Sequence, residues 1–416
     1  MKIFHIGPFP VMHNGVYFTG GVATAVKELT EWLSLHKDSE IFVFADTFYT
    51  DKASQWHEQK GNYHIFKPIR KRISNIHEFF QLFGVWIFCR QIFLYTTDKI
   101  RQILFKKERN YKYALASLYY QKIIQSMNPD IIHAHHAHER AIVAWHASGG
   151  RIPIVVTLHS FHGLLGPRPA KFVELYKKTF TIAKKMIAVS HFIKMQAIEL
   201  GAKKEETAVI HNGLNTNEFV PASRNTAREK LNFSQETKIV LFVGSLIERK
   251  GIDILMQSFS RLKPGPENIK LVIIGNGPLE KKLRRLRAKL TLDNSVTFLG
   301  SKQGDELRLW YCACDILVVP SRQESQGIVV LEAMACGKAV IGSNVGGIPD
   351  MIKDKETGIL FEPEGVPDLT AKIEKLLGDE KLCDYLGQNA RAKVERDFTW
   401  EQVAGKTMEL YRELRQ

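Results

Sequence analysis

The chain has 416 residues, of which 44% are hydrophobic and 25% are charged, and its formal net charge at pH 7 is +14. This length exceeds what one ordinary hydrophobic core accommodates, so two globular domains are expected. Five scattered cysteines with no CxxC pair argue against a disulfide framework or a zinc site and fit a reducing compartment.

The N-terminal half alternates short apolar runs with longer helical stretches. Helices are expected at residues 22–35 and 171–183, and a strand that begins at residue 2 is not the apolar leader of a signal peptide. The strands are expected at residues 2–7, 41–45, 63–68, 131–135, 154–159, 186–190 and 208–212. This alternation is typical of a parallel, doubly wound α/β sheet.

Residues 67–122 form a basic and aromatic segment with 12 Lys and Arg, 3 Asp and Glu, and 12 aromatic residues. One face of a predicted helix in it carries Ile76, Phe79, Phe80, Phe83 and Ile87. The apolar run 85–95 is too short to cross a bilayer, which requires roughly 20 residues. Two interpretations stay open: a surface that attaches to an anionic membrane, or core helices with a solvated basic face.

A polar stretch without strand character, residues 213–225, separates this half from a second alternating series. The second series has strands expected at residues 240–244, 271–275, 296–300, 316–320, 339–343 and 358–361, and the chain ends in an amphipathic helix over 398–414. Two α/β domains that face each other across a cleft are therefore predicted.

Two glutamates, Glu324 and Glu332, stand eight positions apart around the end of one predicted strand and the start of the next helix. The carboxyl ends of parallel strands form the crevice where open α/β sheets bind ligands. Gly327 permits a close backbone approach, and the helix N-terminus beside it offers N–H groups to a phosphate. Two hydroxyl-binding carboxylates around an anion-binding helix end predict a site for a sugar joined to a phosphate.

Two further loops carry residues suited to a diphosphate. Gly20 and Gly21 precede a helix, where glycine lets the backbone lie close to phosphate oxygens. The loop from Gly244 to Gly251 holds the adjacent cations Arg249 and Lys250, and paired cations at the end of a strand suit a diphosphate. The alternatives are a flexible turn and a solvated helix start. Neither loop matches GxGxxG, so a nicotinamide cofactor is not indicated.

Histidines gather at the ends of two predicted strands. His133 and His135 project to one face of their strand and His136 to the other; His138 follows, and no carboxylate beyond Glu139 accompanies them, so no metal site is predicted. His159 ends the next strand at the edge of the cleft. It is a candidate functional residue, and the alternative is a packed or capping side chain.

Several of these motifs, in this order, resemble the retaining glycosyltransferases of family 4, and the resemblance covers nearly the whole chain. The motifs are RKG at 249–251, IGNGPL at 274–279, the E-x7-E pair at 324 and 332 with the following EAMACGKAVI, and VGGIPD at 345–350. AVS at 188–190, HNG at 211–213 and FTWEQV at 398–403 add to the resemblance.

The resemblance implies the GT-B fold, with two doubly wound Rossmann-like domains facing each other across a cleft. Residues 1–215 would bind the acceptor and residues 216–395 the nucleotide sugar, and a helix within 396–416 would cross back to the first domain. It also implies roles for single residues. Glu332 would hold ribose hydroxyls and Glu324 hydroxyls of the donor sugar. Arg249 and Lys250 would neutralise the diphosphate.

His159 would contact the sugar near the reacting carbon, and the catalytic set would be His159, Glu324, Arg249 and Lys250. Gly21 would let its loop close over the diphosphate. The remaining donor-binding positions would be Gly20, Gly244, Ser245, Gly300, Ser325, Gln326, Gly327 and Ile328.

Three positions depart from the family pattern. Ser245 stands where the family usually has arginine, so the diphosphate contacts differ. Ser325-Gln326-Gly327 replaces the common G-F-G, so Gln326 could add a polar contact to the donor sugar. Asp350 stands where glutamate is more usual.

The implied activity is transfer of a hexose-type sugar, with retention, from a nucleotide-diphosphate sugar to a saccharide or lipid-linked saccharide in surface polysaccharide or glycolipid synthesis of the bacterial type. The leaving phosphate would take the acceptor's proton, so no cofactor and no metal would be required, and no DxD-type motif is evident. The enzyme would be cytoplasmic and attached through residues 67–122 to the inner face of an anionic membrane, with no nucleic-acid partner. The alternatives are an epimerase or hydrolase of the same fold and a non-catalytic basic protein that binds membranes or nucleic acids.

Overall fold

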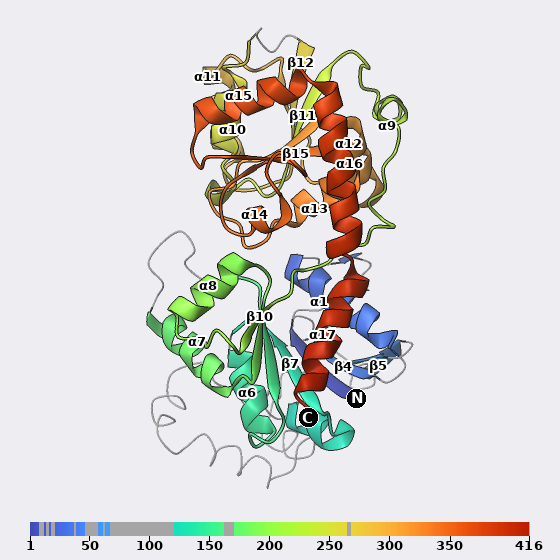
Figure 1. The fold of residues 1–416 in the computed structure, drawn as a ribbon, viewed down its shortest axis with the longest axis vertical. Coiled ribbons are helices and arrows are strands. Elements are labelled where there is room, and N and C mark those ends of the chain that lie inside the picture. Colours follow the sequence, from blue (N-terminus) through green and yellow to red (C-terminus); the bar gives the residue numbers. More distant parts are fainter. Residues whose placement is uncertain are drawn as a thin grey trace.

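The computed structural model describes residues 1–7, 12–13, 16–17, 21–36, 39–45, 57–60, 63–66, 120–137, 139–161, 170–263 and 268–415. The chain forms two α/β domains, one above the other in Figure 1. The predicted fold class is therefore confirmed. Most of the basic segment, residues 67–119, lies outside the described residues, and so do its predicted aromatic helix face and its apolar run.

The N-terminal domain contains an eight-stranded sheet in the order β10-β9-β8-β7-β1-β4-β6-β5. Its strands are β1 (Lys2–Gly7), β4 (Glu40–Ala45), β5 (His57–Lys60), β6 (Tyr63–Phe66), β7 (Ile131–His135), β8 (Ile154–Leu158), β9 (Lys185–Ala188) and β10 (Thr207–Val209). All pairs are parallel except β5 with β6, which is antiparallel. The sequence analysis missed this edge strand because HEQK shows no apolar pattern. β2 (Met12–His13) and β3 (Val16–Tyr17) form a separate two-stranded ribbon.

Helices cover both faces of this sheet, because successive strand residues point to opposite sides. Phe4 and Phe42 pack on one side against helices that include α6 (Glu139–Ala147), α7 (Ala170–Ile182) and α8 (His191–Glu199). Ile3 and Ile41 pack on the other side against α1 (Gly21–Ser34) and α17 (Trp400–Glu413). Residues 120–127, which are also helical, lie on the side of Phe4.

The C-terminal domain contains a six-stranded, wholly parallel sheet in the order β13-β12-β11-β14-β15-β16. Its strands are β11 (Lys238–Val243), β12 (Ile269–Ile274), β13 (Val296–Phe298), β14 (Ile316–Val319), β15 (Ala339–Ser343) and β16 (Ile359–Phe361). Its helices are α9 (Arg224–Lys230), α10 (Ile252–Phe259), α11 (Glu280–Lys289), α12 (Gly304–Ala313), α13 (Ile328–Ala335), α14 (Ile348–Met351), α15 (Val366–Leu377) and α16 (Glu380–Asp397).

The order of these strands creates a crevice at a defined place. The chain runs from β11 outward through β12 and β13, then returns to the other side of β11 as β14. The connections after β11 and after β14 therefore leave in opposite directions, and ligands bind at such switch points. Both loops that the sequence analysis selected, after β11 and after β14, start there.

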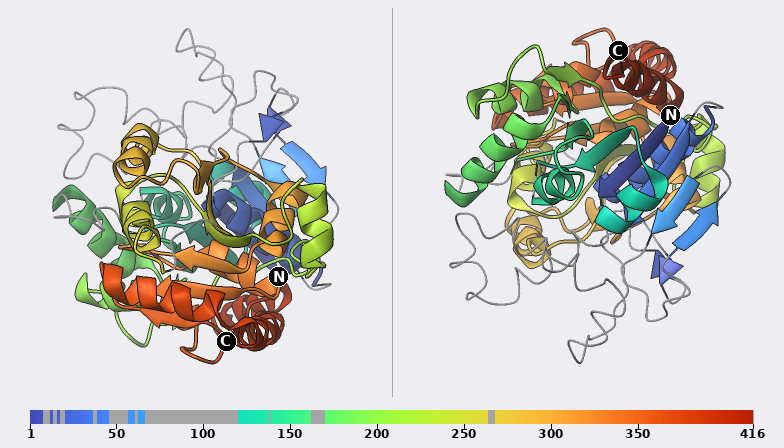
Figure 2. Two further views of the ribbon diagram at one scale, coloured as in Figure 1. Left: turned by 90° about the horizontal axis from the view of Figure 1, so that it is seen from above. Right: turned by 90° about the horizontal axis from the view of Figure 1, so that it is seen from below.

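The last helix returns to the N-terminal domain. The side chain of Thr399 caps the N-terminus of α17, and the backbone of Leu214 bonds to Phe398 at 2.7 Å where the chain crosses. α17 then lies along α1, and both chain ends are on the N-terminal domain (Figures 1 and 2). Asp130 joins the two ends, since it accepts a hydrogen bond from the backbone of Lys2 at 2.7 Å and lies 3.8 Å from Arg415.

None of the helices in the described ranges combines the length and the hydrophobicity that crossing a bilayer requires.

Candidate active site

The loops that follow β11 and β14 are joined by their backbones. The carbonyl of Arg249 accepts hydrogen bonds from the N–H groups of Arg322 at 2.8 Å and Gln323 at 3.3 Å. Gly251, at φ +63°, allows this approach, because a Cβ atom there would lie 2.0 Å from the carbonyl oxygen of Pro320. The RKG motif thus needs its glycine to bring the two cations next to the second loop.

Lys250 and Glu324 form an ion pair at this junction. The ammonium of Lys250 bonds to Oε2 of Glu324, and Nη1 of Arg249 lies 3.9 Å from Oε1 of the same carboxylate. Glu324 is 7% exposed, so the pair is shielded from water, whereas the guanidinium side chain of Arg249 is 35% exposed. Two cations around one buried carboxylate make this a strongly polarised site.

A third loop, after β15, fixes the backbone of Glu324. The carbonyl of Glu324 accepts a hydrogen bond from Gly347 N–H at 3.0 Å. Gly346 has φ +58°, and a Cβ atom on it would lie 1.9 Å from that carbonyl oxygen. The GG of the VGGIPD motif is therefore required by close packing against the glutamate loop.

We expect Gly346→Ala to reduce the predicted sugar transfer, because the added methyl group must displace the Glu324 backbone or the loop that packs on it. The matched control is Gly405→Ala in α17, where a Cβ atom meets no atom within 4 Å and alanine stabilises a helix by roughly 0.5–1 kcal/mol. Activity and melting temperature of both variants are compared with the parent protein. Equal activity of Gly346→Ala and the parent would contradict this packing argument.

Glu332 lies on α13, half-buried, and is held by a neighbouring helix. The hydroxyl of Tyr311, a buried residue of α12, donates a hydrogen bond to Oε2 of Glu332 at 2.6 Å. Burial raises the pKa of Glu332 to about 7, although the bond from Tyr311 acts in the opposite direction, and the charge of Glu218 raises it further. Glu332 is therefore a carboxyl group poised between its two protonation states near neutral pH.

Gln326 connects the glutamate loop to the other domain. Its amide Oε1 accepts from Asn212 N–H at 2.8 Å, and its Nε2 donates to the Asn212 carbonyl at 2.9 Å. The side chain is 3% exposed. Both polar groups of the Gln326 amide are therefore bonded to the segment between the domains. A contact of Gln326 with the donor sugar stays a prediction, and it requires that bonds to the sugar replace these bonds.

Asp350 makes a second connection between the domains. Its Oδ2 accepts from the backbone N–H of His191 at 2.7 Å and lies 3.1 Å from Nε2 of His211, and its Oδ1 lies 3.3 Å from Nδ1 of His191. Burial acts to raise the pKa of Asp350. The hydrogen bonds from His211 and His191 act in the opposite direction and hold this pKa below its ordinary value. The aspartate that replaces the usual glutamate thus bridges the domains through α8.

The other predicted donor-binding residues are on several elements of the two domains. Gly327, at φ +95°, immediately precedes Ile328, the first residue of α13, and Gly21 is the first residue of α1. Ser325 is half-buried on the glutamate loop, and its carbonyl oxygen would lie 2.4 Å from a Cβ atom on Gly347. Gly20 lies outside the described residues.

Three further predicted donor-binding residues follow strands of the C-terminal sheet: Gly244 and Gly300 connect neighbouring strands, and Ser245 is exposed. Gly244 donates its N–H to Ile274, and Gly300 accepts from Gly275 at 2.8 Å. The backbone that follows β11, β12 and β13 is therefore connected across the edge of the sheet.

Buried histidines lie at the ends of the N-terminal strands. Nδ1 of His135 is 3.1 Å from Nε2 of His159, and burial lowers the pKa of His159 to about 4. The nitrogens of His5, His133 and His135 come within 4.8 Å of one another, as do the ligand atoms of His191, His211 and Asp350. In the first group, the hydroxyl of Tyr411 is already the hydrogen-bond partner of His5 and His133, and in the second the carboxylate is the partner of both histidines.

The chain matches two family descriptions in succession: Glycosyltransferase Family 4 over residues 19–218 and Glycosyl transferases group 1 over residues 223–393. An uncharacterized glycosyltransferase of Methanocaldococcus jannaschii is 34% identical over 311 residues, which cover 74% of this chain and 83% of that protein. The chain is a group 1 glycosyltransferase. The predicted family is thereby confirmed.

Other proteins are similar to this chain in sequence or in fold. The N-acetyl-alpha-D-glucosaminyl L-malate synthase of Bacillus anthracis is 30% identical over 305 residues, covering 72% of this glycosyltransferase and 79% of that enzyme. Sucrose-phosphate synthase of Thermosynechococcus elongatus superimposes with a TM-score of 0.76 at 23% identity, covering 99% and 98% of the two chains. Anabaena HepE in complex with UDP and glucose has a TM-score of 0.72 at 20% identity, covering 99% and 100%. The two structures show the shared GT-B fold.

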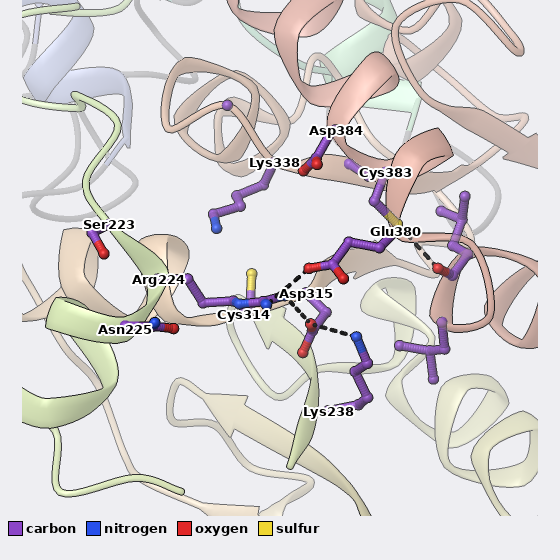
Figure 3. A pocket seen from close by; sticks show the side chains of 14 residues that line it. Ser223, Arg224, Asn225, Lys238, Cys314, Asp315, Lys338, Glu380, Cys383 and Asp384 are labelled. Carbon is purple, nitrogen blue, oxygen red and sulfur yellow. Dashed lines mark hydrogen bonds and ion pairs between the residues drawn. The ribbon is translucent and has the colours of Figure 1, made fainter. Parts of the chain in front are cut away.

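A cavity of about 380 Å³ lies at the opposite edge of the C-terminal sheet of the glycosyltransferase (Figure 3). It is lined by the residues at or just before the starts of β11, β14 and β15, namely Lys238, Asp315 and Ala339. Two of its cations are ion-paired, since Arg224 and Lys238 lie 3.0 and 3.5 Å from Asp315. Ligands bind at the carboxyl ends of such strands, so this cavity lies at the opposite edge of the sheet from the predicted donor site around Glu324.

Sequence reasoning did not find Tyr311, Asn212 or His5 as neighbours of the site. For Tyr311 the sequence offers one indication, since a tyrosine in an otherwise apolar buried helix segment needs a partner for its hydroxyl. The sequence does not indicate that this partner is Glu332. The contacts of Asn212 and His5 depend on how separate elements pack, which no local pattern of the glycosyltransferase sequence encodes.

Proposed function

We propose that this glycosyltransferase moves a hexose-type sugar from a nucleotide-diphosphate sugar to a saccharide or lipid-linked saccharide acceptor, with retention of configuration. The observation that carries the proposal is the cluster of Arg249, Lys250 and Glu324 at the switch point between β11 and β14. Cations at this edge suit the diphosphate, and the N-terminus of α13 beside them offers further N–H donors. The ligands of a structural neighbour, UDP and glucose, support a nucleotide sugar as donor.

The charges at the site account for bond cleavage. Breaking the sugar–phosphate bond leaves positive charge on the sugar and negative charge on the diphosphate. Lys250 and Arg249 are preorganised to stabilise the negative charge as it develops. Glu324 is held between these cations and accepts from sugar hydroxyls, whereas a carboxylate paired in this way is a poor nucleophile. This favours a front-face substitution, in which the leaving phosphate takes the proton of the acceptor hydroxyl.

Metal independence is part of the same proposal. The two side-chain cations supply positive charge where other transferases use a divalent ion, and we propose that transfer proceeds in the presence of EDTA. The alternative functions, an epimerase or a hydrolase of the same fold, consume the donor without an acceptor.

The test begins with a thermal-shift screen of nucleotide sugars, since a bound donor stabilises the folded protein by mass action. Consumption of the stabilising donor is then measured with and without acceptors, and the anomeric configuration of the product is read from proton coupling constants by NMR. Acceptor-dependent turnover with the donor's anomeric configuration is expected. Equal consumption without an acceptor would favour the hydrolase or epimerase, and an inverted product would refute retention.

We also propose a peripheral attachment to the inner face of an anionic membrane, in surface polysaccharide or glycolipid synthesis of the bacterial type. The net charge of +9 over residues 67–122 supports this, because each Lys or Arg near an anionic leaflet contributes about 1 kcal/mol of attraction. Flotation with vesicles of anionic lipid at low salt is expected, and flotation should be lost at high salt. Absence of binding at low salt would refute the attachment.

A further inference from the structure

We propose that His135 is a positioning residue that fixes the tautomer of His159, so that His159 presents Nδ1–H to the donor sugar. The proposal deepens the proposed function, since it rests on His159 as the residue that contacts the sugar. Nothing in the E-x7-E site involves His135, and the sequence analysis treated it only as a metal candidate.

Strand register places the histidines in one row. His5 pairs with His133 across β1 and β7, and His135 pairs with Thr157 across β7 and β8. His159 follows β8, two positions after Thr157, and therefore points to the same face. α1 and α17 cover this face. The row runs from beneath α17 to the carboxyl edge of the sheet, where His159 lies.

Hydrogen-bond donors can be assigned along the inner part of this row. The hydroxyl of Thr30 donates to the carbonyl of Val26 at 2.8 Å, so its oxygen accepts from Nδ1 of His5 at 3.3 Å. Nε2 of His5 must then accept from the hydroxyl of Tyr411 at 3.2 Å.

The assignment continues through the next histidine. The oxygen of Tyr411 accepts from Nδ1 of His133 at 2.5 Å, and Nε2 of His133 accepts from the hydroxyl of Thr157 at 2.7 Å. Burial lowers the pKa of His5 to about 3 and holds the pKa of His133 well below its ordinary value, so each ring carries one proton at neutral pH. The two inner histidines are therefore fully satisfied, and neither has a nitrogen left for His135.

His135 and His159 share one hydrogen bond, between Nδ1 of His135 and Nε2 of His159 at 3.1 Å. Burial keeps both rings neutral, so a single proton lies between these nitrogens. Nε2 of His135 is buried and has no hydrogen-bond partner among the described residues. Buried N–H groups without a partner are rarer in proteins than under-used acceptors. The proton of His135 therefore belongs on Nδ1, where it is donated to His159.

This assignment decides what His159 offers to a ligand. With Nε2 as the acceptor, the proton of His159 is on Nδ1, and Nδ1–H can donate to a sugar oxygen or to a phosphate. Because the imidazole of His159 is neutral, its N–H group adds no positive charge beside the sugar carbon, which itself becomes positively charged during transfer. The stacked rings of His135 and His159, with centroids 5.4 Å apart, keep the second imidazole in this orientation.

The test has a spectroscopic readout and a kinetic one. Long-range proton–nitrogen NMR of the ¹⁵N-labelled full chain, without donor, distinguishes protonated from unprotonated ring nitrogens, and His159→Asn assigns the signals of His159. Protonated Nδ1 and unprotonated Nε2 are expected for His159. His135→Asn, which retains an N–H near the position of Nδ1, should keep this tautomer, whereas His135→Phe should lose it.

The kinetic readout uses the same two variants. His135→Phe should lower kcat about 10- to 100-fold with less than a threefold change in the KM for the donor, and His135→Asn should restore most of kcat. The matched control is His36→Phe, two residues beyond the C-terminal end of α1, which should leave kcat unchanged. An unprotonated Nδ1 in His159, or a parental kcat in folded His135→Phe, would overturn the proposal. Absence of any sugar transfer by the parent would refute the proposed function alone, because the NMR result is obtained without a donor.

Discussion

Lys250→Ala is expected to lower kcat for sugar transfer by about 10²–10³-fold while the protein remains folded, which is the effect of removing one preorganised group that stabilises developing charge. Lys250 is the more buried of the two cations at the site, and its ammonium bonds to Glu324. The positive charge is therefore in place before the diphosphate forms. Glu324→Ala should have an effect of similar size, because it removes the partner that holds Lys250.

The matched control is Lys281→Ala, the same substitution at an exposed position on α11. Circular dichroism and the melting temperature establish that each variant folds, and kcat is measured at saturating donor. Lys250→Arg is a useful third variant, since it keeps the charge but replaces a compact ammonium with a planar fork. Turnover at the parental rate in folded Lys250→Ala would remove this residue from the mechanism.

The sequence was sufficient to predict the Lys250–Glu324 junction for a topological reason. The apolar runs that became β11 and β14 were visible by composition, and the ligand-binding edge of a parallel sheet is a general property of the fold. The loops after these strands had to meet at the switch point, and the close approach of Gly251 to Pro320 is the physical result.

Contacts between distant elements were not predictable in this way. Gln326 was interpreted as a residue facing the donor, yet both polar groups of its amide bond to the backbone of Asn212. Nothing local in the SQG sequence distinguishes these two partners, because the choice depends on how close the two domains lie. His5 likewise joins His133 only because β1 is inserted between β4 and β7.

The departures from regular pattern were the weakest part of the fold prediction. The strand expected at residues 186–190 ends at Ala188. The side chain of Ser190 accepts a hydrogen bond from Ile193 N–H and thereby caps the N-terminus of α8. Apolar periodicity alone does not reveal such a cap, although serine before a helix is a known signal. The antiparallel strand β5 has no apolar alternation at all, since it lies at the edge of the sheet.

Glu332→Gln is expected to weaken donor binding about 10- to 100-fold at pH 8, the usual cost of losing hydrogen bonds to a charged group. An ionised carboxylate can accept two hydrogen bonds from the ribose that Glu332 is proposed to hold, whereas in the protonated form one oxygen is occupied by a proton. Since the pKa of Glu332 is about 7, donor affinity of the parent should rise as the pH increases from 6 to 8. The affinity of Glu332→Gln should show no such rise. Calorimetric titration across this range measures both effects.

The same substitution should stabilise the free protein at pH 8. The pKa of Glu332 is raised from 4.5 in the unfolded reference to about 7 in the folded protein, so between these values the folded state binds a proton that the unfolded state releases. The free energy of unfolding therefore falls as the pH rises through this window, by roughly 3 kcal/mol at 1.36 kcal/mol for each pKa unit.

Glutamine carries no charge to bury and still accepts from Tyr311, so Glu332→Gln should melt at a higher temperature than the parent at pH 8, with little difference at pH 5. Glu409→Gln, at an exposed position of α17, is the control. A lower melting temperature of Glu332→Gln at pH 8 would show that the carboxylate is stabilised by groups other than Tyr311. A parental donor affinity of Glu332→Gln would exclude Glu332 from the nucleotide site.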